Sequence, residues 1–503
     1  MSPLLLFSFV IGYFLLLLVV AWYTGRNSNN DSFFIGNRNS NWMLVAFGMI
    51  GTSLSGVTFV SVPGAVSKES FAYLQITLGY LIGYFAIAFV LLPLYYRLNL
   101  TSIYNYLSSR LGVKSYKTGA SFFILSRTLG ATARLYLVVK ILQDAILTSF
   151  DIPFWLTTLI ILIMILLYTY EGGVKTIVYT DTLQTTCMLA GLVICVIFIL
   201  NKLDMGLGQS LQAMGNKGYT KIFFTDPNSK LFFLKQILAG AFITVTMTGM
   251  DQEMMQKNIS VKTLKDSKKN VVTLGFIMLV VISLFLVLGG LLHLYAENLG
   301  GHLATVTENG KEITRYMIET NDATADKLFP VVALKYMPPL ISVIFIIALI
   351  SALFPSADGA ITALTSSFCI DILGMQRRTD WSDAAKKKTR QRVHLVFAAI
   401  FLVFVMVYKW IDSPSMIGVI LKVAAYTYGP LLGLFTFGII TKRKVNDAIV
   451  PFICVAAPLV CFFLDKFQKQ LFGGFEIGLE LLIINGLLTF IGLLSISKKA
   501  TVV

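Results

Sequence analysis

The sequence predicts an all-α membrane protein, and three observations carry that prediction. Of the 503 residues, 56% are hydrophobic and only 13% are charged. A soluble domain has about 25% charged and about 45–50% apolar residues. The apolar residues form continuous runs, whereas the strands of an outer-membrane barrel alternate apolar and polar residues over short segments. This composition argues against a soluble enzyme, a disordered chain and a nucleic-acid-binding protein.

Thirteen apolar runs come close to the roughly 20 residues that a helix needs to cross a bilayer. The first run lacks a basic start and a cleavage site and is too long for a signal peptide, so we predict a retained helix. The predicted spans are 4–23, 43–62, 72–96, 118–148, 153–170, 176–200, 231–254, 271–296, 329–367, 393–408, 415–440, 446–464 and 478–496.

The basic residues predict the orientation of these spans. With the N-terminus outside, the inside segments carry 24 Lys and Arg residues, Lys257 among them, and the outside segments carry 11. Cytoplasmic loops carry such an excess, so we predict a multi-pass protein of the cytoplasmic (inner) membrane with its C-terminus in the cytoplasm. The mixed-charge segment 297–327 would be an external hairpin or short helix. The basic run 377–392 would be a cytoplasmic loop beside anionic membrane lipid.

Motifs for enzymatic chemistry are missing from the sequence. It has no GxxxxGK[ST] phosphate loop, so ATP is not the obvious energy source. The five cysteines form no CxxC pair and the three histidines are scattered, which predicts no metal centre. We expect no catalytic residues, no nucleic-acid partner and no required protein partner. A secondary transporter is favoured over an ion channel or a membrane enzyme, because neither a filter repeat nor a nucleophile–base pair is visible.

The second span is interrupted by polar and small residues. Between Phe47 and Phe59 it holds three glycines and four hydroxyl residues. Backbone carbonyls freed by an unwound helix, together with hydroxyls, would form an oxygen site suited to Na⁺. The alternative is close helix packing through small residues, and composition does not separate the two.

The ninth span carries a second polar interruption. Pro355 frees a backbone carbonyl, Ser356 adds a hydroxyl, and Asp358 is an acid within a span, which is costly unless it is paired or ion-bound. Asp181 is a further acid, in the sixth span, at a depth comparable to that of Gly51. These features predict one shared site. The alternatives are a proline kink with a locally satisfied Asp358, and a helix cap at Asp181.

Two arginines mark the fourth span. Arg127 and Arg134 are seven residues, or about two turns, apart and share nearly one helix face. They would bind an anionic solute or pair with internal carboxylates. The polar segment 251–257 is predicted to be a network at the end of the seventh span and not a substrate site.

Several motifs, in order, resemble the solute:sodium symporter family, which includes carriers of sugars, proline, pantothenate and sialic acid. The resemblance covers about residues 31–445. The motifs are Asp31–Trp42, Thr101–Gly112, Glu171–Gln184 and Asp251–Gln256. The resemblance implies sodium-coupled import of a small organic solute by alternating access, with Na⁺ as the coupling ion. A proton-coupled carrier in which Asp358 titrates, or a solute sensor on the same fold, is the alternative.

The resemblance also implies two inverted five-helix repeats, a fold similar to that of an amino-acid carrier. The whole chain, 1–503, would be one transporter domain. Its parts would be an extra first helix (4–23), a first repeat (43–200), a second repeat (231–440) and C-terminal helices (446–496).

The site residues follow from the same resemblance. The shared sodium site would use carbonyls of Gly51, Leu54 and Ala352 and the hydroxyl of Ser356, although Pro355 replaces a hydroxyl residue often found there. Some members of the family have a second sodium site that uses an acid in the sixth span, and Asp181 resembles that acid. Asp358 would lie near it, at a position where such relatives have serine. The position of Arg127 resembles the one at which sialic-acid carriers hold a carboxylate, so the resemblance implies an acidic sugar or another small organic anion as the solute. The residues expected to contact solute are Ser53, Ser55, Thr58, Gln75 and Arg127.

Overall fold

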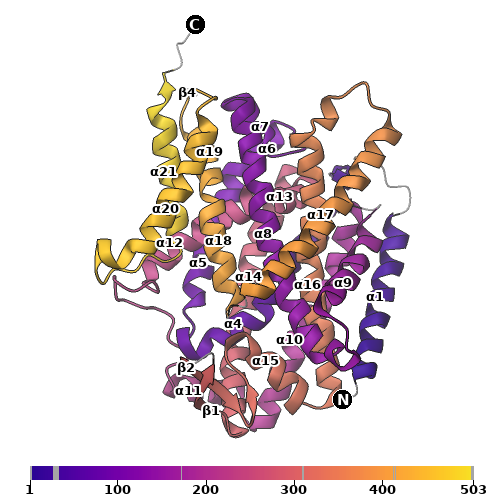
Figure 1. Ribbon diagram of the computed structural model, residues 1–503, viewed down its shortest axis with the longest axis vertical. Coiled ribbons are helices and arrows are strands. Elements are labelled where there is room, and N and C mark those ends of the chain that lie inside the picture. The colour runs from indigo at the N-terminus through magenta and orange to yellow at the C-terminus, as the bar shows by residue number, and fades with distance from the viewer. Residues whose placement is uncertain are drawn as a thin grey trace.

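The computed structural model describes residues 3–25, 33–34, 36–170, 173–308, 311–411, 413 and 415–499. The chain is a bundle of long helices (Figure 1). Among the described residues, eight helices are long and apolar enough to cross a membrane, or up to eleven if each of three bent pairs is one span. Two shorter apolar helices accompany them. Every predicted span coincides with one of these elements, and the total of thirteen crossings stays a prediction.

The long helices are α1 (Pro3–Gly25), α5 (Tyr73–Ala86) continued by the π-helical η2 (Ile87–Leu91) and α6 (Leu92–Arg97), α8 (Val113–Ala145), α10 (Gly173–Leu203), α14 (Leu264–Asn298), α16 (Pro339–Ser367), α17 (Asp383–Ile411) and α20 (Val450–Phe472). The bent pairs are α3 (Trp42–Ser53) with α4 (Gly56–Glu69), α12 (Phe233–Thr244) and η4 (Val245–Gly249) with α13 (Gln252–Ile259), and α18 (Met416–Thr427) with α19 (Gly429–Ile440). The shorter apolar helices are α9 (Phe154–Thr169) and α21 (Leu481–Ser495).

Connecting elements complete the chain: η1 (Gly36–Arg38), α7 (Asn105–Arg110), η3 (Leu147–Phe150), α11 (Leu207–Asn216), β1 (His302–Glu308), β2 (Lys311–Ile318), β3 (Asn321–Asp322), η5 (Ala325–Lys327), α15 (Leu328–Val331), η6 (Val332–Tyr336), η7 (Phe368–Ile372), η8 (Met375–Arg377), β4 (Lys444–Val445) and β5 (Ser497–Lys498).

Burial separates central helices from peripheral ones. In α16 and its extension, 83% of the most apolar window is buried, against 22% in α20 and 33% in α1. α16 packs against α10, α8 and α3. The exposed faces of α1 and α20 carry large apolar side chains such as Val19 and Phe452, as expected of helices whose outer surface contacts lipid. The centre of the protein is therefore built around α16.

The two ends of the bundle differ. α1 begins at the end that carries β1 and β2, whereas β4 lies at the opposite end, towards which α21 runs (Figure 1). Strands β1 to β3 form an antiparallel sheet in which His302 pairs with Met317 and Met317 pairs with Asp322. Of the two forms expected for segment 297–327, the structure thus has the hairpin.

Two predicted segments were wrong in detail. The span at 329–367 is divided: η6 ends at Tyr336 and α16 begins at Pro339, because Met337, before two prolines, is extended (φ −102°, ψ 157°), as residues before proline are. The run 377–392 is not all loop, since α17 begins at Asp383. Its alanines, lysines and arginines favour helix, and Asp383 in the first turn complements the helix dipole.

Candidate functional site

The first bent pair interrupts the second span where the sequence predicted. α3 ends at Ser53, α4 begins at Gly56, and the two axes differ by 56°. Glycine is required here by close packing. A Cβ on Gly51 would lie 2.4 Å from Thr185 Oγ1, and one on Gly56 would lie 2.4 Å from Val138 Cγ2. The break therefore combines free backbone groups with tight contacts to α10 and α8.

The second bent pair interrupts the seventh span, whereas the sequence predicts that this span ends at residue 254. α12 and η4 meet α13 at an angle of 65°. Asp251 begins α13, and its carboxylate accepts the backbone N–H groups of Glu253 (2.9 Å) and Met254 (3.2 Å). Tyr428, at the bend between α18 and α19, donates its hydroxyl to the same carboxylate at 2.7 Å. The predicted polar network exists, but in the middle of a broken span.

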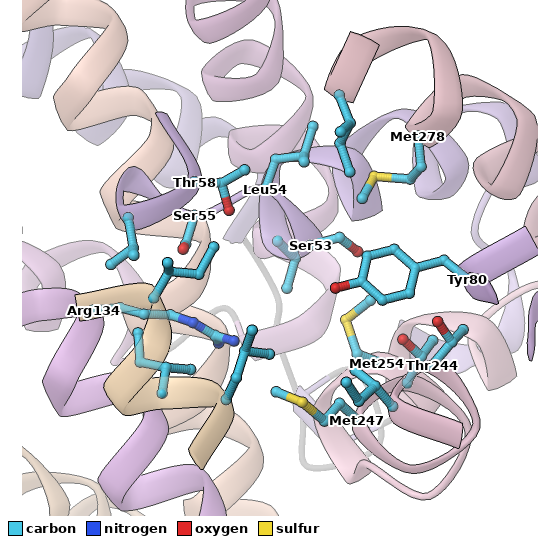
Figure 2. Close-up of a pocket in the computed structure, with 18 of the residues that line it drawn as sticks. Ser53, Leu54, Ser55, Thr58, Tyr80, Arg134, Thr244, Met247, Met254 and Met278 are labelled. Atoms are coloured by element: carbon cyan, nitrogen blue, oxygen red, sulfur yellow. The ribbon is translucent and has the colours of Figure 1, made fainter. Parts of the chain in front are cut away.

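A cavity of about 90 Å³ lies between the two breaks. α3 and α4 contribute Ser53, Ser55 and Thr58 on one side, and Thr244 and Met254 come from the other broken pair. Figure 2 shows Arg134 reaching into this space from α8, across from Ser53 and Tyr80. The remaining lining is mainly apolar, from α5, α14 and α18. A mainly apolar pocket with a few polar groups is typical of a small-molecule site.

The two arginines of α8 differ in their partners. Arg127 is 4% exposed and forms ion pairs with Glu253 and with Asp251, the latter at 3.9 Å. No acidic side chain of the described residues is within ion-pair distance of Arg134, which is partly exposed to the cavity. The cavity thus has one neutralised cation and one whose charge is not paired.

A buried cluster of charges lies beside the cavity. Lys257 of α13 donates to Asp181 Oδ2 and to Thr52 Oγ1, each at 2.7 Å, and lies 3.8 Å from Glu253 Oε1. Lys257 is 3% exposed and Asp181 is fully buried. The prediction that Lys257 is a cytoplasmic loop residue is wrong, because Lys257 lies in the buried helix α13.

Comparisons with known proteins agree with this architecture. A sequence profile of the "Sodium:solute symporter family" matches residues 33–448. This chain belongs to that family. The sodium/sialic acid symporter SiaT of Proteus mirabilis is 25% identical over 87% of this chain and 85% of its own length. The sodium/sialic acid symporter NanT of Aliivibrio fischeri is 22% identical over 88% and 84%.

Solved structures support the fold. A substrate-bound, outward-open Na⁺-coupled sialic acid symporter superimposes with a TM-score of 0.80 at 19% identity, over 97% of this chain and 96% of that one. The nucleobase-cation symporter Mhp1 superimposes with a TM-score of 0.54 at 12% identity, covering 93% of both chains. The symporter is thus a multi-pass membrane transporter of a solute, with Na⁺ as its coupling ion, and the family is one of transporters.

The residues predicted for the shared sodium site lie in the buried centre of the symporter. Leu54 and Ala352 are at most 1% exposed, and a Cβ on Gly51 would lie 3.5 Å from Pro355 Cγ, so α3 packs against α16 here. Ser356 donates its hydroxyl to the carbonyl of Leu353 at 2.8 Å. Their role as sodium ligands stays a prediction.

The two acids predicted for the second sodium site contact other side chains of the protein, and their role as sodium ligands stays a prediction. Asp181 holds Lys257, as described, and Asp358 Oδ2 accepts the hydroxyl of Tyr168 from α9 at 2.8 Å. The other oxygen of Asp358 accepts the backbone N–H of Gly359. Both oxygens of Asp358 are therefore bonded within the protein, as the alternative for Asp358 has it. Asp181 differs, because its Oδ1 atom is buried without a hydrogen-bond partner.

Of the predicted solute contacts, Ser53, Ser55, Thr58 and Arg127 line the cavity. Gln75 does not, because its amide bridges the carbonyl of Leu231 and the N–H of Phe224, each at 3.2 Å. Sequence reasoning did not find the lining residue Tyr80, since aromatic residues are abundant throughout the chain. Arg134 was visible, but only the structure separates it from Arg127.

The motifs Asp31–Trp42 and Glu171–Gln184 lie partly outside the described residues, at 31–32, 35 and 171–172. The remainder of the first motif contains the start of α3, where Asn41 accepts the N–H of Met43 at 2.9 Å. The remainder of the second opens α10, on which Asp181 lies two turns from the first residue. Both motifs therefore contribute helix starts beside the site.

Proposed function

We propose that this symporter imports a small organic anion of the acidic-sugar type across the cytoplasmic membrane, and that Arg134 binds the anionic group of the solute. The observation that carries this proposal is the unpaired charge of Arg134 at the cavity. A guanidinium binds a carboxylate through two parallel hydrogen bonds. In a partly desolvated cavity, such a pair is stronger than it would be in water.

Arg127 has a different role in this proposal. Its charge is balanced by Glu253 and Asp251, so a solute carboxylate would meet no net positive charge there. Arg127 would shape the cavity, and Ser53, Ser55, Thr58 and Tyr80 would offer hydroxyls to the polar groups of the solute. Gln75 would contribute from outside the cavity by fixing the segment before α12.

Relatives support the class of solute. Two of the similar symporters are named for sialic acid, an anionic sugar, and each aligns with more than four fifths of this chain. The solved structure with a TM-score of 0.80 is also of a sialic acid symporter. Since their identity to this chain is 25% or less, we assign the class of solute and not the compound.

Sodium would bind where the break of α3 meets α16. The proposed ligands are the carbonyls of Gly51, Leu54 and Ala352 and the hydroxyl of Ser356. Bound Na⁺ would hold α3 against α16 and favour the outward-open state, and its release inside would loosen that contact. Coupling requires that Na⁺ binds one state more tightly than the other.

The broken pair α3–α4 would be the first span of one inverted repeat, 43–200. The broken pair α12–α13 would be the first span of the other, 231–440, and α1 would be the extra helix. In the proposed orientation, the N-terminus and the β1–β3 sheet lie outside the cytoplasmic membrane. Without Lys257, the segments predicted to lie inside carry 23 basic residues and those predicted to lie outside carry 11, so the bias towards a cytoplasmic C-terminus persists. The domain does not act as an enzyme in this proposal.

Uptake of radiolabelled N-acetylneuraminic acid into proteoliposomes, driven by an inward Na⁺ gradient, tests the proposal. We expect competition by hexuronic acids and none by neutral hexoses. Arg134→Gln should raise KM about 10- to 100-fold, since a hydrogen bond to a charged group contributes about 1.5–3 kcal/mol. Thr248→Val, which also alters the cavity lining, is the control and should change KM little. An unchanged KM in Arg134→Gln, or equal competition by hexoses, would reject the anionic solute.

A further inference from the structure

The carboxylate of Asp181 already has a cation. The Nζ atom of Lys257 lies 2.7 Å from Asp181 Oδ2 and 2.7 Å from Thr52 Oγ1, and Thr52 Oγ1 lies 3.3 Å from the same carboxylate oxygen. These three side chains come from α13, α10 and α3 and are at most 3% exposed. An ammonium group thus receives oxygen ligands from two helices, as a bound metal cation would.

The surroundings of Lys257 keep it in this place. Glu253, one turn earlier on α13, lies 3.8 Å from the ammonium and also pairs with Arg127. The cluster therefore consists of two balanced pairs, Lys257 with Asp181 and Arg127 with Glu253. Asp251 is satisfied by the helix N–H groups and by Tyr428. A further cation on Asp181 would be repelled by an ammonium in direct contact with it, in surroundings that screen charge poorly.

Protein groups also occupy the α16 side of this position. Both oxygens of Asp358 are used, one by Tyr168 and one by the N–H of Gly359. A Cβ on Gly359 would lie 2.3 Å from Glu253 Oε1, so the carboxylate of α13 fills the space beside α16. At this position α16 is thus in direct contact with α9 through Tyr168 and with α13 through Glu253.

We infer that Lys257 is the resident cation at the position where a second Na⁺ would bind, and that this symporter binds one Na⁺. The inference rests on the proposed sodium site between α3 and α16. Because the ammonium is covalently part of α13, it ties α13 to α10 and α3 at any Na⁺ concentration. Only the ion at the α3–α16 site then responds to the sodium gradient.

Equilibrium binding of ²²Na⁺ to the purified full-length protein tests the inference. We expect one Na⁺ per wild-type protein and a Hill coefficient of about 1. Lys257→Gln removes the ammonium and leaves the carboxylate free, so we expect two Na⁺ per protein and a Hill coefficient between 1 and 2. Lys257→Arg keeps the charge and should bind one. The double variant Asp181→Asn, Lys257→Gln has no free charge, should fold, and should also bind one.

The outcomes separate this inference from the sodium site on which it rests. Two Na⁺ per wild-type protein, with one lost in Asp181→Asn, overturns the role of Lys257 and leaves sodium coupling intact. One Na⁺ in a monodisperse Lys257→Gln protein also overturns it, because the vacated carboxylate then forms no site. If Lys257→Gln does not fold, the wild-type count and Asp181→Asn decide. No Na⁺ in wild type and in Ser356→Ala alike means that the α3–α16 site is wrong.

Discussion

The two helix breaks beside the cavity bend by similar angles, 56° and 65°, but differ in chemistry. The α3–α4 break has no charged residue between Phe47 and Phe59 and exposes hydroxyls and backbone groups. The α12–α13 break is followed by Asp251, Glu253 and Lys257, whose charges are paired within the protein. In the proposed mechanism the first break takes a cation from solution to balance its oxygen atoms, whereas the second break carries its own charges.

This difference predicts opposite responses to mutation and to salt. Changes at the charged break should alter the free energy of unfolding regardless of Na⁺, because its partners are covalent parts of the chain. Changes at the uncharged break should alter mainly the dependence of stability on Na⁺. Breaking a buried ion pair by removing one partner costs more than losing a ligand site that is only partly occupied.

The largest effect is expected at Arg127. Arg127→Met removes the cation that pairs most closely with Glu253 and that also pairs with Asp251, and the loss of one partner of a buried pair costs about 3–5 kcal/mol. The melting temperature of the purified protein should fall equally in NaCl and in KCl. Arg134→Met, on the same helix, is the control and should melt near wild type because it breaks no ion pair.

A double variant sharpens this test. Arg127→Met with Glu253→Gln removes both charges of the closest pair, so it should recover a large part of the lost stability. If the double variant is as unstable as the two single variants added together, the pair does not act as a unit and the charged break is not what holds α8 to α13.

A smaller, sodium-specific effect is expected at Ser356. A ligand at about 100 times its dissociation constant adds about 2.7 kcal/mol to the folded state, so wild type should melt higher in NaCl than in KCl at equal ionic strength. Ser356→Ala should reduce that difference. Ser342→Ala is matched to it: both serines lie in α16, are buried and donate to a backbone carbonyl at 2.8 Å. An equal reduction in both variants would remove Ser356 from the sodium site.

The same comparison explains what the sequence could predict. The first break is visible because glycines and hydroxyl residues interrupt an apolar run, and their low helix propensity acts locally. The sequence predicts a helix end at the second break, because an Asp that caps a helix looks the same whether it ends a span or divides one. Only the burial of α13, which depends on distant helices, decides between the two.

The partners in the ion pairs could not be predicted from the sequence either. Arg127 and Arg134 share a helix face by their spacing, but only the first meets Glu253, 126 positions later in the chain. The sequence predicts Lys257 to be a loop residue because its neighbours in the sequence are polar. The spans themselves were predictable because each apolar run reflects transfer into lipid, which is local to the segment.

The smallest effect concerns η5, which packs against α4 and lies outside the membrane-spanning segments. The carboxylate of Asp326 in η5 accepts the backbone N–H of Met416 at 2.9 Å, at the start of α18. Burial raises the pKa of Asp326 to about 6, so the folded protein binds this proton more tightly than the unfolded chain. The stability from this proton is complete below pH 3.8 and is lost as the pH rises through 6.

Between pH 5 and pH 7 this group should therefore lower the free energy of unfolding by about 1.3 kcal/mol. Asp326→Asn should flatten that part of the pH profile of the melting temperature, because the amide oxygen still accepts the N–H of Met416 but does not titrate. Asp322→Asn, in the same connection, is the matched control. Burial raises the pKa of Asp322, but hydrogen bonds from Lys327 and Thr324 outweigh this and lower it, so it stays ionised over this range. A profile that Asp326→Asn leaves unchanged would mean that the charge of η5 does not limit how α18 packs beside α4.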